Sequence, residues 1–419
     1  MVAPTATRCS THQSLAVAEV RASAEVVELT QFHMKDVELG KLLGSGGFSS
    51  VYSFYHKADA ASSTSIASRS SNHGMDTASP KKQTDFMAST KRMAKLSATA
   101  ALSSTTMSSK TNNSSSFLEV NEDTTSTSED PLDNDASQSD SKDDDSARIE
   151  LALKTLHCKT LRDKDTMRRA MQDMTYEVSI LATLQKAQHP HIIRMHGISS
   201  DFWDSPSTAF VVLEKLEEPL DQALVRWKEE GTNYRHSPFW NRWTKPHLSK
   251  AAQTVRWQKV AIDLADVLAF LHRRNIVFRD LKPANIGFDA HGKLRLFDFA
   301  CARVLEPGGQ FKHRCGTLRY MAPECARKEP YDGSADVYSF GMVLWEVCTL
   351  ERPYRHADDR PSLTEKVTQA GKHPALQKVH STFIRFLLAR CWRDEPHGRP
   401  SFASIHAWMQ NEQDRGLCE

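Results

Sequence analysis

Four side chains in the second half of this chain have the types and spacing that chemistry on a phosphate group requires. They are, in chain order, Asp280, Lys282, Asn285 and Asp298. An acid can orient a hydroxyl group, a lysine can neutralise a phosphoryl group in transfer, and an amide and a second acid can offer oxygen ligands to Mg²⁺. The apolar run 294–297 indicates a buried strand that brings Asp298 to the other three.

Elements earlier in the chain have to hold the phosphate group against these side chains. A strand-like run from Val37 leads into the turn Gly44–Val51, whose glycines let backbone amides approach phosphate oxygens. The alternating run 149–154 predicts a strand that places Ala152 and Lys154 on one face. Apolar residues at helical spacing over 167–181 predict a helix with Glu177 at the edge of its apolar face.

The combination resembles the eukaryotic protein kinases, and in particular the tyrosine-kinase-like group of serine/threonine type. Arg-Asp-Leu-Lys-Pro-x-Asn (279–285) followed by Asp-Phe is similar to their catalytic and metal-binding loops. Gly316–Glu324 is similar to the segment that receives the protein substrate, and the run 391–402 to the end of the domain. The resemblance implies an α+β, bilobal protein kinase fold with a small β-rich N-lobe containing the helix αC and a larger, mainly α-helical C-lobe.

The resemblance also implies a role for each matching residue. Asp280 and Lys282 are the expected catalytic pair, and Asn285 and Asp298 the expected Mg²⁺ ligands. Lys154, set by Glu177, is expected to hold the α- and β-phosphates of ATP. The expected ATP-binding residues are Leu43, Gly44, Ser45, Gly46, Gly47, Phe48, Ser49, Val51, Ala152, Lys154, Glu177, Glu214 and Leu216. A buried ion pair between Glu324 and Arg399 is expected to support the substrate segment.

Three positions depart from the family pattern. Phe278 replaces the usual histidine, and we expect it to pack in a column with Phe299 and Leu181. Ala300 replaces a glycine, and alanine allows fewer backbone conformations. We therefore expect the segment Asp298–Ala300 to change its backbone conformation more rarely than in the family. Gly287 replaces a large apolar residue under the adenine, a loss for which Ile286 and Phe288 are expected to compensate in part. Because of these departures, the alternative function is that of a pseudokinase, a binding or scaffolding module with the same fold. Dual specificity, for tyrosine as well as serine and threonine, is a further alternative.

The loop between Ala300 and Gly316 contains no serine, threonine or tyrosine. Kinases with an arginine before the catalytic aspartate often use it to bind a phosphate on this loop, and Arg279 has no such partner upstream of Thr317. We therefore expect activation without loop phosphorylation. Glu306 is a candidate partner for Arg279 instead.

Composition predicts a folded intracellular protein with two insertions. The 419 residues carry a net charge of +2, which gives no argument for binding nucleic acid. The eight cysteines include no C-x-x-C pair, so reduced thiols are expected, and no apolar run is long enough to span a membrane. We expect a disordered leader over 1–33 in place of a transit peptide, a kinase domain over 37–410, and a disordered Ser/Thr-rich insertion over 57–147.

The remaining expectations concern partners and location. The expected substrates are ATP, with Mg²⁺, and a protein that supplies the accepting hydroxyl. The insertion 57–147 is a candidate site for a regulatory partner. Four aromatic residues in the loop 231–254, Tyr234, Phe239, Trp240 and Trp243, indicate local packing first and a docking surface second. The cytoplasm is the expected compartment, and the basic cluster between Lys81 and Lys95 makes the nucleus the alternative.

Overall fold

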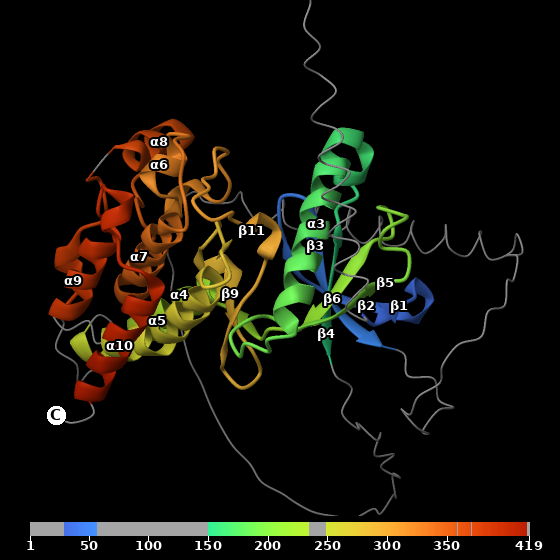
Figure 1. The fold of residues 1–419 in the computed structure, drawn as a ribbon. Coiled ribbons are helices and arrows are strands. Elements are labelled where there is room, and N and C mark those ends of the chain that lie inside the picture. The colour runs from blue at the N-terminus through green and yellow to red at the C-terminus, as the bar shows by residue number, and fades with distance from the viewer. Residues whose placement is uncertain (1–28, 57–149, 234–248, 358, 370, 417–419) are drawn as a thin grey trace, which may run out of the picture.

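The computed structural model describes residues 29–56, 150–233, 249–357, 359–369 and 371–416. They form two lobes: a sheet with the long helix α3 (Lys164–Gln185) beside it, and a larger body of helices (Figure 1). The 57–147 insertion and the four aromatic residues of the 231–254 loop lie outside the described residues. Within the described part of the chain, no helix has the length and apolar character needed to cross a membrane.

The small lobe contains a six-stranded sheet in the order β1-β5-β6-β4-β3-β2. The strands are β1 (Gln31–Phe32), β2 (Val37–Ser45), β3 (Ser49–His56), β4 (Leu151–Leu156), β5 (Met195–Ser199) and β6 (Phe210–Glu214). Only β1 runs parallel to its neighbour, β5; the other neighbouring pairs are antiparallel. Since β3 pairs with β4, the residues before and after the insertion belong to one sheet.

Strand β4 has apolar neighbours on both faces. Leu151 and Leu153 pack with Phe54 and Phe210 in a small cluster on one side, and Ala152 belongs to the main core on the other. The alternation of side chains along a strand puts Lys154 on the face of Ala152, toward α3. This confirms the face predicted for both residues.

Helix α3 begins at a capped end. Asp163 is the N-cap residue, and its side chain accepts a hydrogen bond of 2.9 Å from the amide of Thr166. The buried residues of the second half of the helix, among them Val178 and Leu181, pack into the main core. The same face therefore carries Glu177 inward.

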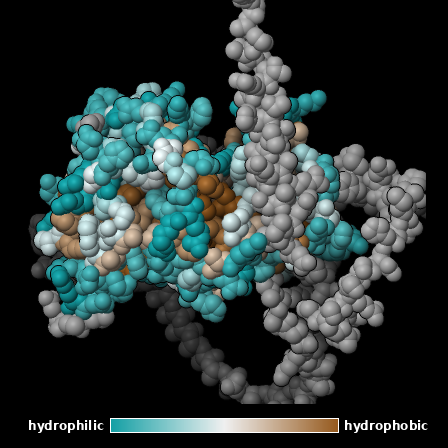
Figure 2. All heavy atoms as spheres, viewed as in Figure 1, coloured by the Kyte–Doolittle hydropathy of each residue, from teal (hydrophilic) through white to brown (hydrophobic). Residues whose placement is uncertain are grey.

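The large lobe is organised around a buried helix, α7 (Ser334–Thr349), of which every residue except Ser334 and Ser339 is buried. It packs between α5 (Lys250–His272) and α9 (Thr382–Cys391). The other helices described in this lobe are α4 (Leu220–Asn233), α6 (Pro323–Ala326), α8 (Arg360–Thr368) and α10 (Phe402–Gly416). Most of the visible surface is hydrophilic, and a hydrophobic patch lies between the two lobes (Figure 2).

Short strands beneath the small lobe carry the catalytic residues. One sheet has the order β10-β9-β7, from β7 (Glu218–Pro219), β9 (Ile286–Phe288) and β10 (Leu294–Leu296). The other pairs β8 (Ile276–Val277) with β11 (Arg303–Val304). The loop 278–285 leaves β8 and enters β9, and Asp298 lies two residues after β10, so both acids of the predicted set lie in loops that follow short strands.

One predicted boundary was wrong. The described end of the 1–33 leader is ordered, because Gln31 and Phe32 form β1 and Phe32 packs edge-on against Phe54 at 5.9 Å. In the large lobe, helix α5 begins at Lys250, because Ser249 caps it through the amide of Ala252.

Candidate active site

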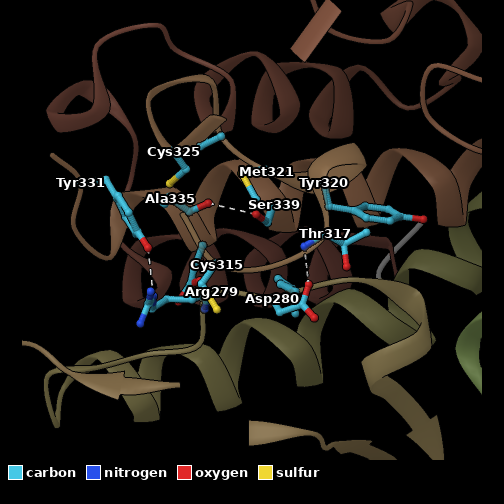
Figure 3. Close-up of a pocket in the computed structure, with 13 residues that line it drawn as sticks. Arg279, Asp280, Cys315, Thr317, Tyr320, Met321, Cys325, Tyr331, Ala335 and Ser339 are labelled. Carbon is cyan, nitrogen blue, oxygen red and sulfur yellow. Dashed lines mark hydrogen bonds between the residues drawn. The ribbon is translucent and has the colours of Figure 1, made fainter. Parts of the chain in front are cut away.

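Three polar residues, Lys282, Asn285 and Thr317, lie around Asp280, and Figure 3 shows Thr317 bonded to it. Lys282 Nζ lies 2.7 Å from Asp280 Oδ2 and donates to Thr317 Oγ1 at 3.1 Å. The amide of Thr317 donates to Asp280 Oδ1 at 2.7 Å. Asn285 Nδ2 donates to the Asp280 carbonyl oxygen at 2.8 Å. Thr317 therefore contacts both Asp280 and Lys282.

A buried acid on α7 holds the backbone of this loop. Asp336 accepts from the amides of Phe278 and Arg279, each at 2.8 Å, and lies 2.9 Å from His272 Nε2. Arg279 has a left-handed backbone with φ of 70°. Such a conformation is costly for a residue with a side chain, so the two hydrogen bonds to Asp336 help to impose it. The sequence interpretation missed this role of Asp336.

Lys154 links both lobes through two carboxylates. Its Nζ lies 2.7 Å from Glu177 Oε2 on α3 and 2.9 Å from Asp298 Oδ1 after β10. Burial by itself would lower the pKa of Lys154, but the charges of Asp298 and Glu177 outweigh it and raise the pKa. Burial would likewise raise the pKa of Asp298, and Lys154 holds it below its usual value. The lysine is therefore positively charged and fixed.

The glycine-rich turn between β2 and β3 has open space around it. A Cβ atom placed on Gly44 or Gly47 would meet no heavy atom within 4 Å, and one on Gly46 would lie 3.7 Å from the nearest atom. His157, just after β4, lies 2.9 Å from the Gly46 carbonyl oxygen and 2.9 Å from Ser50 Oγ. It tethers the turn to the sheet, and the sequence interpretation had not singled it out.

The other predicted nucleotide-binding residues lie around the sheet and the linker to the large lobe. Val51 is opposite Lys154 in the sheet, and Ala152 is opposite Leu213. Glu214 uses its amide to bond the Arg194 carbonyl oxygen at 2.9 Å and its side chain to bond the Arg194 amide at 2.8 Å. The backbone amide of Glu214 is therefore not available to adenine. Leu43 and Phe48 are partly exposed at the glycine-rich turn.

The predicted Mg²⁺ ligands fit the needs of that ion only together with a phosphate. Among the described residues, no group of three or more His, Cys, Asp and Glu could hold a metal. Asn285 and Asp298 offer hard oxygen atoms, and Mg²⁺ in proteins is commonly held by one or two such side chains plus substrate phosphates and water. The amide nitrogen of Asn285 is bonded to Asp280, which leaves its oxygen available.

Comparison with known proteins decides the family. The model of the protein kinase domain matches residues 141–409. This chain belongs to the protein kinase family. The bilobal α+β fold expected from the resemblance is thereby confirmed, with a β-sheet N-lobe and a helical C-lobe.

The chain is similar to serine/threonine and dual-specificity kinases. It is 30% identical to the dual specificity protein kinase shkB of Dictyostelium discoideum over 61% of this chain and 35% of that protein. It is 40% identical to the serine/threonine-protein kinase STY17 of Arabidopsis thaliana over 35% of this chain and 26% of that protein. The matches thus span about a third or less of these relatives.

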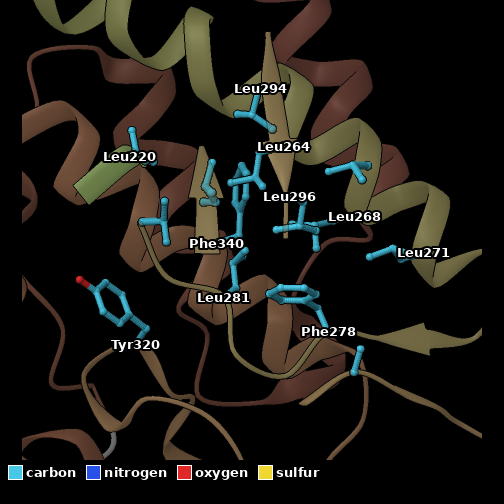
Figure 4. Close-up of a cluster of buried hydrophobic side chains, with 14 of the residues drawn as sticks. Leu220, Leu264, Leu268, Leu271, Phe278, Leu281, Leu294, Leu296, Tyr320 and Phe340 are labelled. Carbon is cyan, nitrogen blue, oxygen red and sulfur yellow. The ribbon is translucent and has the colours of Figure 1, made fainter. Parts of the chain in front are cut away.

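Phe278, which replaces the usual histidine, fills its position in the core among apolar side chains. This side chain is buried and meets Phe299 edge-on, with ring centroids 5.2 Å apart. Figure 4 shows Phe278 beside Leu281 at the edge of the large-lobe core. The predicted contact of Phe278 with Phe299 is confirmed, and Leu181 is buried in the same cluster.

The expected compensation at Gly287 was wrong. Ile286 and Phe288 alternate away from Gly287 along β9 and are buried in the main core. A Cβ atom on Gly287 would lie 2.9 Å from Leu216 Cδ1 and 3.3 Å from Phe297 Cε1. Leu216 and Phe297 therefore occupy the space that a larger residue at 287 would need.

Arg279 has aromatic and carbonyl partners in place of a phosphate. Its Nε donates to Tyr331 Oη at 3.0 Å, its Nη2 donates to the His313 carbonyl oxygen at 3.3 Å, and its guanidinium lies 4.5 Å from the ring centre of Phe311. Phe311 and Tyr331 exchange both backbone hydrogen bonds. Within the described chain, Glu306 is not among the partners found for Arg279.

Two cysteines join the ends of the activation loop. Cys301 and Cys315 form a disulfide with a Cα–Cα distance of 6.4 Å. The expectation of reduced thiols was therefore wrong for this pair. The two cysteines are 14 residues apart and form no C-x-x-C pattern, so the sequence did not indicate that they pair. The fold of the loop brings them together.

A further link connects the activation loop to α3. Arg303 Nη2 lies 2.9 Å from Asp173 Oδ1, and its guanidinium lies 4.2 Å from the ring centre of Tyr176. The sequence interpretation missed this contact, since Asp173 and Arg303 are separated by 130 residues. The helix that carries Glu177 is thus held by the loop that follows Asp298.

Below the loop, Arg399 Nη1 lies 2.6 Å from Glu324 Oε1, so the buried ion pair predicted for these residues is confirmed. Both side chains are almost completely buried. The arginine also bonds the carbonyl oxygens of Arg393 and Ser334. The pair therefore holds the substrate segment to the start of α7.

Proposed function

We propose that this chain is an ATP-dependent protein kinase that transfers the γ-phosphoryl group of ATP to serine and threonine hydroxyls of proteins. One observation carries the proposal: the Lys154–Glu177–Asp298 contacts and the Asp280–Lys282–Thr317 contacts are formed at the same time. Phosphoryl transfer depends mainly on positioning and on charge stabilisation, and both need these side chains in place together.

Asp280 is the residue that we infer to orient the accepting hydroxyl and to take its proton. Its two oxygens are held by Thr317 and Lys282, which fixes the direction of the carboxylate. Lys282 then lies beside the group in transfer and balances its negative charge. Bound Mg²⁺, held through Asn285 and Asp298, would supply positive charge to the phosphate oxygens.

Lys154 is the residue that we infer to hold the α- and β-phosphates. Glu177 and Asp298 keep it positively charged, and Val51, just after the open glycine-rich turn, is its partner in the sheet. Asp298 bonds this lysine and would also be a ligand of bound Mg²⁺. Thr317 and Lys282 support serine/threonine specificity, and the similarity to a dual-specificity kinase keeps tyrosine as a second acceptor to be measured.

A kinase assay on a generic basic protein tests the proposal with matched controls. We expect Asp280→Asn to lower kcat by about a hundredfold to ten-thousandfold, since a positioned base contributes that much. Lys154→Met is expected to abolish turnover. Asp414→Asn and Lys372→Met make the same changes at exposed sites and should retain wild-type turnover. Identification of the phosphorylated amino acid decides between Ser/Thr and dual specificity.

The rival function is that of a pseudokinase, favoured by Phe278, Gly287 and Ala300. ATP binding without turnover in the wild type would establish it. Turnover that persists in both Asp280→Asn and Lys154→Met would show a contaminating enzyme and defeat the assignment.

The proposal extends to partners and location. The accepting partner is a protein, and the 57–147 insertion is the candidate site for a regulatory partner. The cytoplasm is the proposed compartment, with the nucleus as the alternative. Comparison of binding partners and of cell fractions for the full chain and for a chain lacking 57–147 tests both statements.

A further inference from the structure

A pocket of about 610 Å³ opens next to the catalytic loop, on the side of the substrate segment. Its walls are the stretch 314–321, the loop after α7 and the first turn of α8. Thr317, which bonds both Asp280 and Lys282, is one of the lining residues. A side chain in this pocket would therefore belong to a residue near the hydroxyl that receives the phosphoryl group.

The charge of the pocket is strongly positive. Four arginines and a single acid line it, namely Arg314, Arg319, Arg352, Arg360 and Asp359. Asp359 is already engaged as the N-cap of α8, where it accepts from the amide of Ser362 at 2.6 Å. The arginines thus outnumber the acid in a space wide enough for a side chain.

The arginines divide into one structural residue and three exposed ones. Arg319 donates to the carbonyl oxygens of Tyr354 at 2.9 Å and Ala357 at 3.5 Å, and so shapes the wall. Arg314, Arg352 and Arg360 are exposed, and in the described chain none of them forms a salt bridge with a carboxylate. Their guanidinium groups are free to bind an anion.

We propose, on the basis of the kinase function above, that this pocket selects protein substrates with an anionic side chain close to the accepting serine or threonine. Guanidinium groups bind carboxylates and phosphates through paired, charge-assisted hydrogen bonds. The anion is the carboxylate of Asp or Glu or the phosphate of a previously phosphorylated residue. Arg314, Arg352 and Arg360 are the specificity-determining residues.

A peptide series tests the proposal directly. Each peptide has one acceptor serine and the same neutral sequence, with Glu, phosphoserine, Gln or Lys scanned through the flanking positions. At one position or more, we expect kcat/KM for the Glu or phosphoserine peptide to exceed that for the Gln peptide by about tenfold, mainly through KM, as charged hydrogen bonds of this kind allow. The Lys peptide should be the poorest, and added salt should shrink the differences.

Charge reversal in the protein supplies the second arm. Arg352→Glu combined with Arg360→Glu should invert the order, so that the Lys peptide is preferred over the Glu peptide. Arg415→Glu combined with Lys372→Glu changes the net charge equally at exposed positions outside the pocket and should keep the wild-type order. A thermal melt of each variant shows that it is folded.

The outcomes separate the substrate class from the kinase function. Equal kcat/KM for all four peptides would overturn the pocket and leave the kinase standing. If no peptide is phosphorylated, fluorescence anisotropy with labelled peptides still decides: tighter binding of the anionic peptides supports the pocket while the kinase proposal fails, and equal binding overturns the pocket. If kcat/KM for the phosphoserine peptide is well above that for the Glu peptide, the substrate is a previously phosphorylated protein. If the two kcat/KM values are similar, the substrate is an acidic protein.

Discussion

At the scale of single residues, the site depends on which charges are satisfied by the protein itself. Lys154 has two carboxylate partners, and Asp280 has a lysine, an amide and a side-chain amide around it. These groups are fixed before any ligand arrives, so little reorganisation is needed during the reaction. Arg314, Arg352 and Arg360 contrast with them, since their charge is left exposed.

One buried acid in the large lobe should make the stability depend on pH. Burial raises the pKa of Glu346 to about 7, and Tyr320 Oη donates to its Oε2 at 2.8 Å. The ordinary glutamate pKa is 4.5. Between these values the folded state keeps a proton that the unfolded state has lost. The free energy of unfolding should therefore fall as pH rises through this window, by on the order of 3 kcal/mol in total.

Glu346→Gln isolates this contribution. Glutamine retains an oxygen that can accept from Tyr320 and has no proton to lose. The free energy of unfolding should therefore fall less between pH 5 and pH 8 in the variant than in the wild type. Urea denaturation at the two pH values measures it. Equal pH dependence in the wild type and the variant would show that Glu346 is not the group responsible.

At the scale of elements, the activation loop is held at both ends and in its middle by contacts that contain no phosphate. The Cys301–Cys315 disulfide joins its ends, Arg303 ties its start to α3, and Arg279 lies against Phe311. Residues 302–314 can then stay ordered without a modification. Only the absence of hydroxyl residues was visible in the sequence; the three contacts that replace them were not.

Loss of the disulfide should loosen this loop. Cys301→Ser combined with Cys315→Ser is expected to lower the free energy of unfolding by about 3 kcal/mol, the chain-entropy value for a loop of this length. We also expect a lower kcat and faster proteolytic cleavage within 302–314. Dithiothreitol should have the same effects on the wild type, because it reduces the Cys301–Cys315 disulfide to two thiols and is itself oxidised to a cyclic disulfide. Cys158→Ser is the control, since Cys158 is not in a disulfide. Unchanged cleavage and kcat in the double variant would contradict the expectation.

The proposed kinase activity should not depend on phosphate bound to the protein. Because the partners of Arg279 are Tyr331, Phe311 and the His313 carbonyl, phosphatase treatment is expected to leave kcat unchanged within twofold, a difference of less than about 0.5 kcal/mol in the barrier. Mass spectrometry of the treated protein confirms that phosphate is absent. A phosphate on Thr317 or Tyr320 that is required for activity would refute this.

At the scale of the whole molecule, the fold followed from the sequence and several long-range contacts did not. Local motifs such as 279–285 and 316–324 are contiguous, so their roles and the two lobes could be predicted together. Asp336, the Arg303–Asp173 pair and the disulfide join segments that are distant in the chain. One sequence contains no signal of which distant residues meet. The prediction that Ile286 and Phe288 compensate for Gly287 was wrong for the same reason. The space beside Gly287 is filled by Leu216 and Phe297, which come from other segments of the chain.

The small lobe should require residues on both sides of the insertion. A fragment covering 29–56 and 150–416, with a short flexible linker in place of 57–149, is expected to unfold cooperatively and to bind ATP. A fragment that begins at Val37 lacks β1 and should have a lower Tm, because it loses the Phe32–Phe54 contact and the pairing with β5. Differential scanning calorimetry compares the two. Identical Tm values would show that β1 adds no stability.

Strand order therefore sets the limits of the smallest piece that can fold. The match to the family begins at residue 141, yet β4 has β3 as its neighbour, and β3 is encoded ahead of the insertion. A polypeptide cut at the edges of the match would leave unpaired the edge of β4 that faces β3, while its other edge stays paired with β6, and would leave the apolar side chains of Leu151 and Leu153 without Phe54. Open strand edges of that kind recruit other chains. Aggregation, and not a small active enzyme, is what such a truncation should yield.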